Sequence, residues 1–117
     1  MRRVALGGLL IGLLALPAAA GEPSPAADRL LWCGSAFFWL ATDAYDSGED
    51  VEAQQYEAWS DDLTGRADMM LEAEGNDDLA ITALRNAYDS RVVDEMGKPG
   101  AQYDVTTCPD LVVSAVQ

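Results

Sequence analysis

The hydrophobic residues of this chain recur mostly at the spacing of an α-helix. The first such segment covers residues 26–45, and no charged residue interrupts its centre, residues 30–41. A helix that is apolar on every side usually lies at the centre of a helical bundle, and Gly34, Ser35 and Ala36 would let a second helix approach closely. We therefore predict that this helix forms the centre of the fold.

A second helix is predicted over residues 51–74, after a turn at residues 47–50. Its apolar positions recur at spacings of three and four: Tyr56, Trp59, Leu63, Ala67 and Met70. Its other face is acidic: Glu52, Glu57, Asp61, Asp68 and Glu72. Gly75 ends the helix, and the pair Thr64-Gly65 predicts a kink near its middle, because glycine is a poor helix former.

A third amphipathic helix is predicted to begin after Asn76 as its N-cap and to end at Gly97 and Pro99. Adjacent Asp77 and Asp78 would complement the positive end of the helix. Its apolar stripe consists of Ile81, Leu84, Tyr88 and Val92.

A short fourth helix is predicted over residues 110–116. Thr107 and Asp110 have the spacing of a capping box, and Pro109 suits the first helical position. For residues 105–107, just before this helix, an extended conformation is the alternative prediction. No internal repeat and no sustained period-two alternation is found, so the predicted fold is all-α: a small bundle of three main helices plus a short C-terminal helix.

The first twenty residues have the pattern of a secretory signal peptide. It begins with a basic pair, Arg2-Arg3, which an apolar run over residues 4–16 follows. Pro17 then breaks the helix, and small residues stand at positions 18–20. Ala18 and Ala20 predict cleavage before Gly21. The apolar run is shorter than the roughly 20 residues that a membrane span needs, so cleavage is expected rather than anchoring.

Cleavage would give a signal peptide (1–20), a flexible lead-in (21–25) and a single helical domain (26–117) in the periplasm or outside the cell. Lys plus Arg would fall from 7 to 5 against 20 Asp plus Glu, which changes the net charge from −13 to −15. This charge opposes binding to nucleic acid and to anionic membranes. The charge is compatible with a cationic protein partner. The simpler explanation is that the charge only keeps the protein soluble. The oligomeric state is not predicted.

The two cysteines predict one disulfide. Cys33 and Cys108 both lie in the expected exported domain, and thiols in an oxidising compartment usually pair. A redox centre is the alternative, but the chain has no Cys-x-x-Cys pair. We therefore expect a structural bond that joins the first helix to the start of the last.

Little in the sequence points to catalysis. The chain has no histidine, which removes the usual general base and a common zinc ligand, and Lys98 is its only lysine. A calcium loop centred on Gly48 would need ligands where Tyr45 and Gln54 stand. We expect no enzyme, no cofactor and no metal.

The aromatic residues of the first helix allow two interpretations. Burial is the simpler one, whereas an apolar binding patch is the alternative for Trp32, Phe37, Phe38 and Trp39. The main functional hypothesis is a non-enzymatic periplasmic binding or accessory module. The alternative is an acid- or stress-responsive periplasmic chaperone, since the acidic, helical, two-cysteine design is similar in outline to small acid-activated chaperones of the periplasm.

Overall fold

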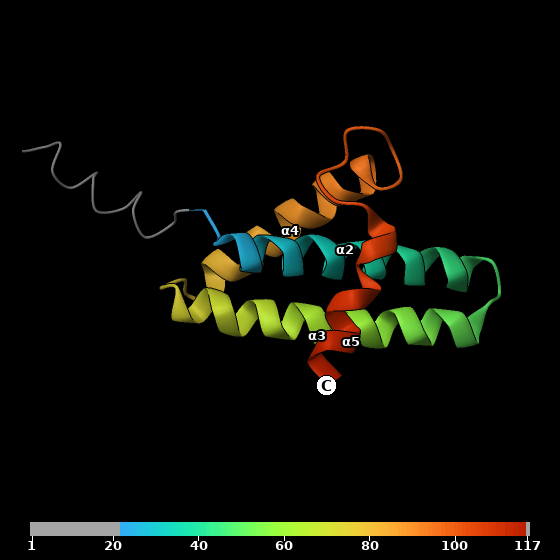
Figure 1. Ribbon diagram of the computed structural model, residues 1–117, viewed down its shortest axis with the longest axis horizontal. Coiled ribbons are helices and arrows are strands. Elements are labelled where there is room, and N and C mark those ends of the chain that lie inside the picture. Colours follow the sequence, from blue (N-terminus) through green and yellow to red (C-terminus); the bar gives the residue numbers. More distant parts are fainter. Residues whose placement is uncertain (1–21, 117) are drawn as a thin grey trace, which may run out of the picture.

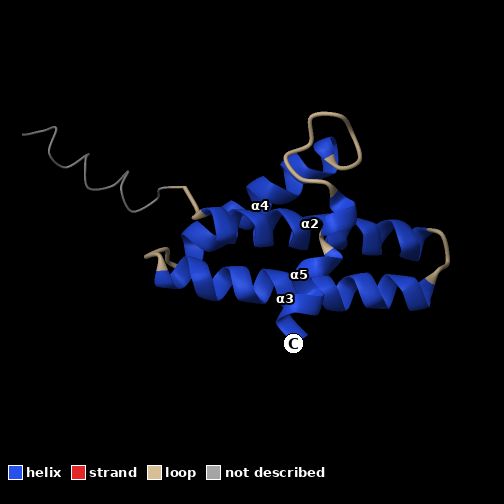
Figure 2. Cartoon of the chain, in the orientation of Figure 1, coloured by secondary structure: helices blue, strands red, loops and turns tan. Residues whose placement is uncertain are grey.

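The computed structural model describes residues 22–116. The predicted signal peptide, with its cleavage site at Ala18, Ala20 and Gly21, lies outside the described residues. The elements are α2 (Pro25–Asp46), α3 (Asp50–Ala73), α4 (Asp78–Glu95), the 3₁₀ turn η1 (Val105–Thr107) and α5 (Pro109–Val116). No strand occurs in this part of the chain (Figure 2), so the predicted all-α fold is confirmed.

Helices α2 and α3 form a long antiparallel hairpin (Figure 1). They approach closely at Gly34, where an added Cβ would lie only 2.7 Å from the Cγ2 atom of Thr64. The hydroxyl of Ser60 donates to the Gly34 carbonyl at 2.8 Å across the same contact. The close approach predicted at Gly34 is therefore confirmed, while α3 continues as one helix through Gly65, where a kink was predicted.

The other two helices cover only part of this hairpin. Helix α4 packs against α2, and α5 crosses α3 (Figure 1). The turn at residues 47–49 and the adjoining helical turns lie beyond both α4 and α5. We call residues 38–61, the end of α2 and the beginning of α3 with their turn, the arm.

The N-terminus of α2 is more firmly held than predicted. Helix α2 begins at Pro25, because the Ser24 hydroxyl accepts a hydrogen bond from the backbone N–H of Ala27 at 3.2 Å. The same hydroxyl donates to the Glu74 carboxylate, at the far end of α3, at 2.6 Å. Residues 24 and 25 of the predicted lead-in therefore belong to the folded domain.

The N-cap of α4 differs from the prediction by one residue. Asp77 caps the helix, since its Oδ1 atom accepts from the backbone N–H of Ala80 at 2.9 Å. Asn76 instead donates from its side chain to the carbonyl of Leu71 at 3.1 Å and so closes the preceding turn. The prediction of Asn76 as the cap was wrong because its backbone N–H also donates to the Leu71 carbonyl, at 3.0 Å, and so places Asn76 in the turn that ends α3.

The segment before α5 also differs from the prediction. Residues Val105–Thr107 form a 3₁₀ turn rather than an extended segment. The Thr107 hydroxyl donates to the carbonyl of Asp104 at 2.7 Å and so belongs to this turn, while α5 begins at Pro109. The predicted capping box between Thr107 and Asp110 was therefore wrong.

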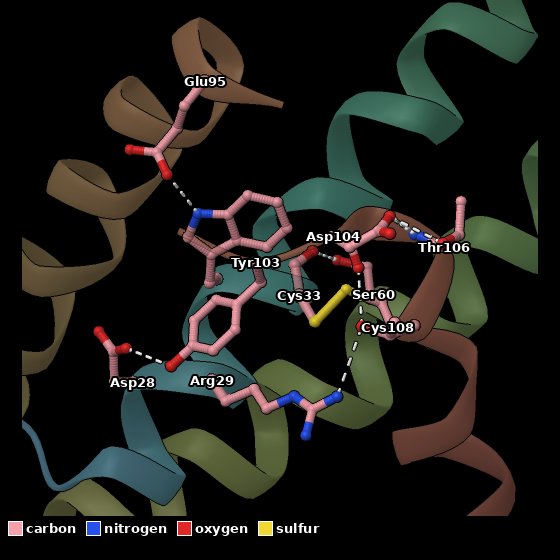
Figure 3. Close-up of a disulfide and its surroundings, with 12 residues drawn as sticks. Asp28, Arg29, Cys33, Ser60, Glu95, Tyr103, Asp104, Thr106 and Cys108 are labelled. Carbon is pink, nitrogen blue, oxygen red and sulfur yellow. Dashed lines mark hydrogen bonds between the residues drawn. A yellow bond between two sulfur atoms is a disulfide. The ribbon is translucent and has the colours of Figure 1, made fainter. Parts of the chain in front are cut away.

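The disulfide between Cys33 and Cys108 is present, with a Cα–Cα distance of 5.5 Å (Figure 3). Both cysteines are fully buried. The bond ties the middle of α2 to the residue before α5, and the hydrophobic core surrounds it on α2, α3 and α4. Within residues 22–116, no helix combines the length and the apolarity needed to cross a membrane.

Candidate functional site

The four aromatic residues predicted as an alternative binding patch have different environments. Trp32 and Phe37 are buried, with 0% and 1% of their surface exposed, so the patch prediction was wrong for both. Trp39 is half-buried and donates from its indole to the Asp89 carbonyl at 3.0 Å. Phe38 is the exception, because 45% of its surface is exposed.

Neighbouring aromatic rings explain why Trp32 and Phe37 are buried. Tyr103, from the loop after α4, packs edge-on against Trp32 with the ring centres 5.6 Å apart. Tyr56 and Trp59 of α3 pack against Phe37 at 6.0 and 5.2 Å. Long-range partners of this kind have no signature in the local sequence pattern.

A cleft of about 390 Å³ lies between α2, α3 and α4. Its buried lining residues are Leu31, Gly34, Ser35, Ala41, Ser60 and Tyr88. The exposed rings of Phe38 and Tyr45 also line it, on α2. The cleft therefore begins at the close contact between α2 and α3 and extends onto the arm.

The charged residues of the cleft are mainly carboxylates. Glu57 and Asp61 line it from α3, and Asp89 lines it from α4. The cation that lines it, Arg85, is already paired with Asp68 at 3.2 Å. Carboxylates together with exposed aromatic rings make a favourable environment for a cationic group.

Two hydrogen bonds orient these carboxylates. The buried Ser35 hydroxyl donates to Oδ1 of Asp89 at 2.7 Å, and Oδ2 of Asp89 accepts no hydrogen bond from the described residues. The Tyr45 hydroxyl donates to Glu57 at 3.0 Å, and this hydrogen bond raises the pKa of Tyr45. Tyr45 therefore stays protonated at neutral pH and holds Glu57 as an acceptor.

The arm carries negative charge only. Its carboxylates are Asp43, Asp46, Glu49, Asp50, Glu52, Glu57 and Asp61, and it contains no lysine or arginine. The neighbouring Glu52 carboxylate raises the pKa of Glu49, first because it can accept a hydrogen bond from the protonated form of Glu49 and then through its negative charge. This raised pKa is the effect expected of crowded like charges.

A second polar cluster holds the loop after α4 against α2 (Figure 3). Asp28 accepts hydrogen bonds from the hydroxyls of Tyr88 and Tyr103 and from the amide of Gln102. Burial, and then the hydrogen bond to Asp28, raises the pKa of Tyr103 to about 12. The phenols therefore stay protonated near neutral pH, and the cluster serves to fasten the loop.

Within the described residues, no group of three or more cysteine and carboxylate side chains is arranged to hold a metal ion. Comparison with protein-family models, with curated proteins and with solved structures finds no significant match to this chain. The geometry of the cleft and the arm is therefore the basis for any functional inference.

Sequence reasoning missed the cleft and the position of Asp89 within it. Asp89 is one acidic residue among many, and only the packing of α4 on α2 brings it beside Ser35. A signal for the arm was present, however. The sequence contains no lysine or arginine between Arg29 and Arg66.

Proposed function

We propose that this protein is an exported, non-enzymatic binding module that engages a cationic protein partner through the arm and its cleft. The observation that carries the proposal is the composition of the arm: seven carboxylates and no cation on a two-helix projection. The exposed rings that line its cleft, Phe38 and Tyr45, supply the nonpolar contact that a charged interface also needs.

The placement of the charges supports a role in binding rather than in folding. Asp43 and Asp46 lie in the last turn of α2, which contains no basic residue. The C-terminus of a helix carries partial negative charge, so acidic side chains there destabilise the helix. Like charges that oppose stability and also crowd together, as those of the arm do, are typical of functional surfaces.

A pair of matched charge variants tests the proposal. The arm variant combines Asp43→Asn, Asp46→Asn and Glu52→Gln, whereas the control variant combines Glu22→Gln, Glu72→Gln and Asp94→Asn. Both remove three exposed negative charges, but the control leaves the arm intact. The probe is a lysine- and arginine-rich peptide, and its affinity is measured by titration calorimetry at low and high salt.

We expect the wild-type protein to bind the peptide and to lose affinity as salt rises, because screening weakens the attraction. The arm variant should bind about tenfold more weakly, and the control variant should retain most of the affinity. Absence of binding at low salt would contradict the proposal. An equal loss in both variants would also contradict it, since it would indicate attraction to net charge alone.

Export is the second part of the proposal. It is supported by the signal-peptide pattern of residues 1–20 and by the disulfide, which is typical of oxidising compartments. Intact mass and N-terminal sequencing of the protein made in a bacterial host with an active secretion system should give a chain that begins at Gly21. Recovery of a reduced chain that retains Met1 would count against export.

A specific observation also favours the chaperone alternative. Glu95 and Asp104 flank the loop that covers Trp32, and hydrogen bonds from Gln102 and Thr106 lower the pKa of these two carboxyls respectively. Protonation in acid would weaken those bonds and loosen the cover. Binding of a hydrophobic dye and suppression of client aggregation between about pH 2 and 4 would support this function, and absence of both would exclude it.

A further inference from the structure

The cleft is elongated and follows one face of α2. Its lining residues on this helix recur at helical spacing: Leu31, Gly34, Ser35, Phe38, Ala41, Thr42 and Tyr45. At 1.5 Å per residue they extend over about 20 Å, which is about four helical turns. This length and shape suit another helix lying along α2.

The position of α4 leaves room for such a helix. Helix α4 packs against α2 through Ser35 and Trp39, both of which contact Asp89. Beyond this point the hairpin has no third helix among the described residues, and Figure 1 shows its end projecting past α4 and α5. Phe38 and Tyr45 remain 45% and 42% exposed on this uncovered face.

We propose that a basic amphipathic helix of the partner protein lies in the cleft along α2 and completes the bundle beside α4. Its apolar side packs on Phe38 and Tyr45, and its basic side chains meet the carboxylates that line the cleft: Glu57, Asp61 and Asp89. This inference rests on the proposed function, because it names the partner element that the acidic arm receives.

Charge complementarity selects this occupant over the two others that an apolar helix face would accept. A second copy of the chain would bring another strongly acidic surface, since the described residues carry 20 carboxylates against five lysine and arginine side chains. An anionic membrane would be repelled for the same reason. A helix with basic flanks and an apolar side satisfies both the carboxylates and the exposed rings.

Two peptides of identical composition provide the test. One is a peptide of about 18 residues whose leucines fall on one helical face and whose lysines and arginines fall on the other. The second peptide has the same residues in an order that gives no amphipathic face. Affinity for each is measured by calorimetry, helix formation by circular dichroism, and the binding surface by amide chemical shifts.

The amphipathic peptide should bind at least about tenfold more tightly than the scrambled one and should gain helix on binding. Phe38→Ser should remove most of this difference, whereas Val51→Ser, an exposed apolar position of the arm outside the cleft, should preserve it. Thermal melts of both variants check that they fold. Amide shifts on the wild-type protein should concentrate at Gly34, Ser35 and Thr42.

The outcomes separate this inference from the function on which it rests. If both peptides bind equally, with the same salt dependence and no shifts at the cleft, the helix inference is wrong and the acidic binding module stands. If neither peptide binds, the proposed function itself fails. Self-association of the free protein through the same amides would identify a second copy as the occupant and overturn the inference.

Discussion

Two glycines within helices differ in what surrounds them, and this difference predicts opposite effects of alanine. At Gly34 a new Cβ would meet the Thr64 Cγ2 atom at 2.7 Å, and Thr64 is held in place by its own hydrogen bond to Ser60. We expect Gly34→Ala to lower the free energy of unfolding by about 1–2 kcal/mol, because overpacking exceeds the gain in helix propensity. Chemical denaturation measures this change.

Gly65 provides the matched control on the neighbouring helix. A Cβ atom added at Gly65 would have no neighbour within 4 Å, so Gly65→Ala should raise the free energy of unfolding by up to about 1 kcal/mol. Adding Thr64→Ser to Gly34→Ala removes the clashing methyl group and should restore most of the lost stability. A Gly34→Ala protein as stable as Gly65→Ala would show that the helices are not tightly packed at this point.

The carboxyl of Glu95 predicts a pH dependence of stability. It accepts hydrogen bonds from the backbone of Gln102 at 2.8 Å and from the Trp32 indole at 2.9 Å, and it pairs with Arg91 at 3.3 Å. The Gln102 bond is the main reason that its pKa is lowered from 4.5. The stabilisation is therefore complete above about pH 4.5 and is lost as the pH falls through the lower pKa of the folded protein.

Glu95→Gln should accordingly lower the free energy of unfolding at pH 7 by about 1 kcal/mol. The difference from wild type should shrink as the pH falls towards 3, because wild-type Glu95 then also becomes neutral. Asp94→Asn, at the exposed neighbouring position, should have little effect at either pH. A difference that is the same at pH 3 and pH 7 would indicate that the charge of Glu95 does not contribute.

At the scale of elements, the disulfide determines how firmly α5 is attached. It closes a loop with a sequence separation of 75 residues between α2 and the start of α5. Replacing both Cys33 and Cys108 by alanine should lower the free energy of unfolding by about 4 kcal/mol, because the unfolded chain gains freedom. Hydrogen exchange should accelerate most in α5.

Reduction of the wild-type protein provides the control for that variant. Its stability should fall to about that of the double alanine variant, since both lack the same covalent constraint. If the free energy of unfolding of the double variant lies within about 1 kcal/mol of that of the oxidised wild type, the disulfide is not what holds α5. Noncovalent packing of Val112 and its neighbours would then hold it.

The helices and the disulfide were predictable because each depends on a local pattern or on chemistry that is independent of the fold. The N-cap of α4 was not, since Asn76 and Asp77 are both good caps and the choice follows from the hydrogen bond of Asn76 to Leu71. The cluster around Asp28 joins residues 60 to 75 positions apart. Such contacts leave no periodic signal, and the cleft beside Asp89 escaped prediction for the same reason.

At the scale of the whole molecule, charge is distributed unevenly, and this has a consequence for stability. All five lysine and arginine residues of the described chain lie outside the arm, at positions 29, 66, 85, 91 and 98. Three of them form salt bridges, through Arg66, Arg85 and Arg91. Because the arm itself contains no lysine or arginine, repulsion among its seven carboxylates dominates there, and added salt should relieve this repulsion.

This imbalance predicts that binding and stability respond in opposite directions to the same substitutions. The arm variant, Asp43→Asn with Asp46→Asn and Glu52→Gln, should bind a cationic peptide more weakly yet melt about 3 °C higher than wild type at low salt. Removing acidic charge from the last turn of α2 relieves the unfavourable interaction with the helix C-terminus, and fewer like charges remain on the arm. The increase should shrink in high salt.

The control variant, with Glu22→Gln, Glu72→Gln and Asp94→Asn, distinguishes this effect from a general response to net charge. It removes the same number of charges outside the arm. Glu72 and Asp94 lie in the last turns of α3 and α4, so this variant shares the relief at helix C-termini but not the relief of repulsion within the arm. Its melting temperature should therefore change less than that of the arm variant. If the melting temperatures of both variants rise equally, repulsion is spread over the whole surface, and the charges of the arm do not destabilise the protein more than charges elsewhere.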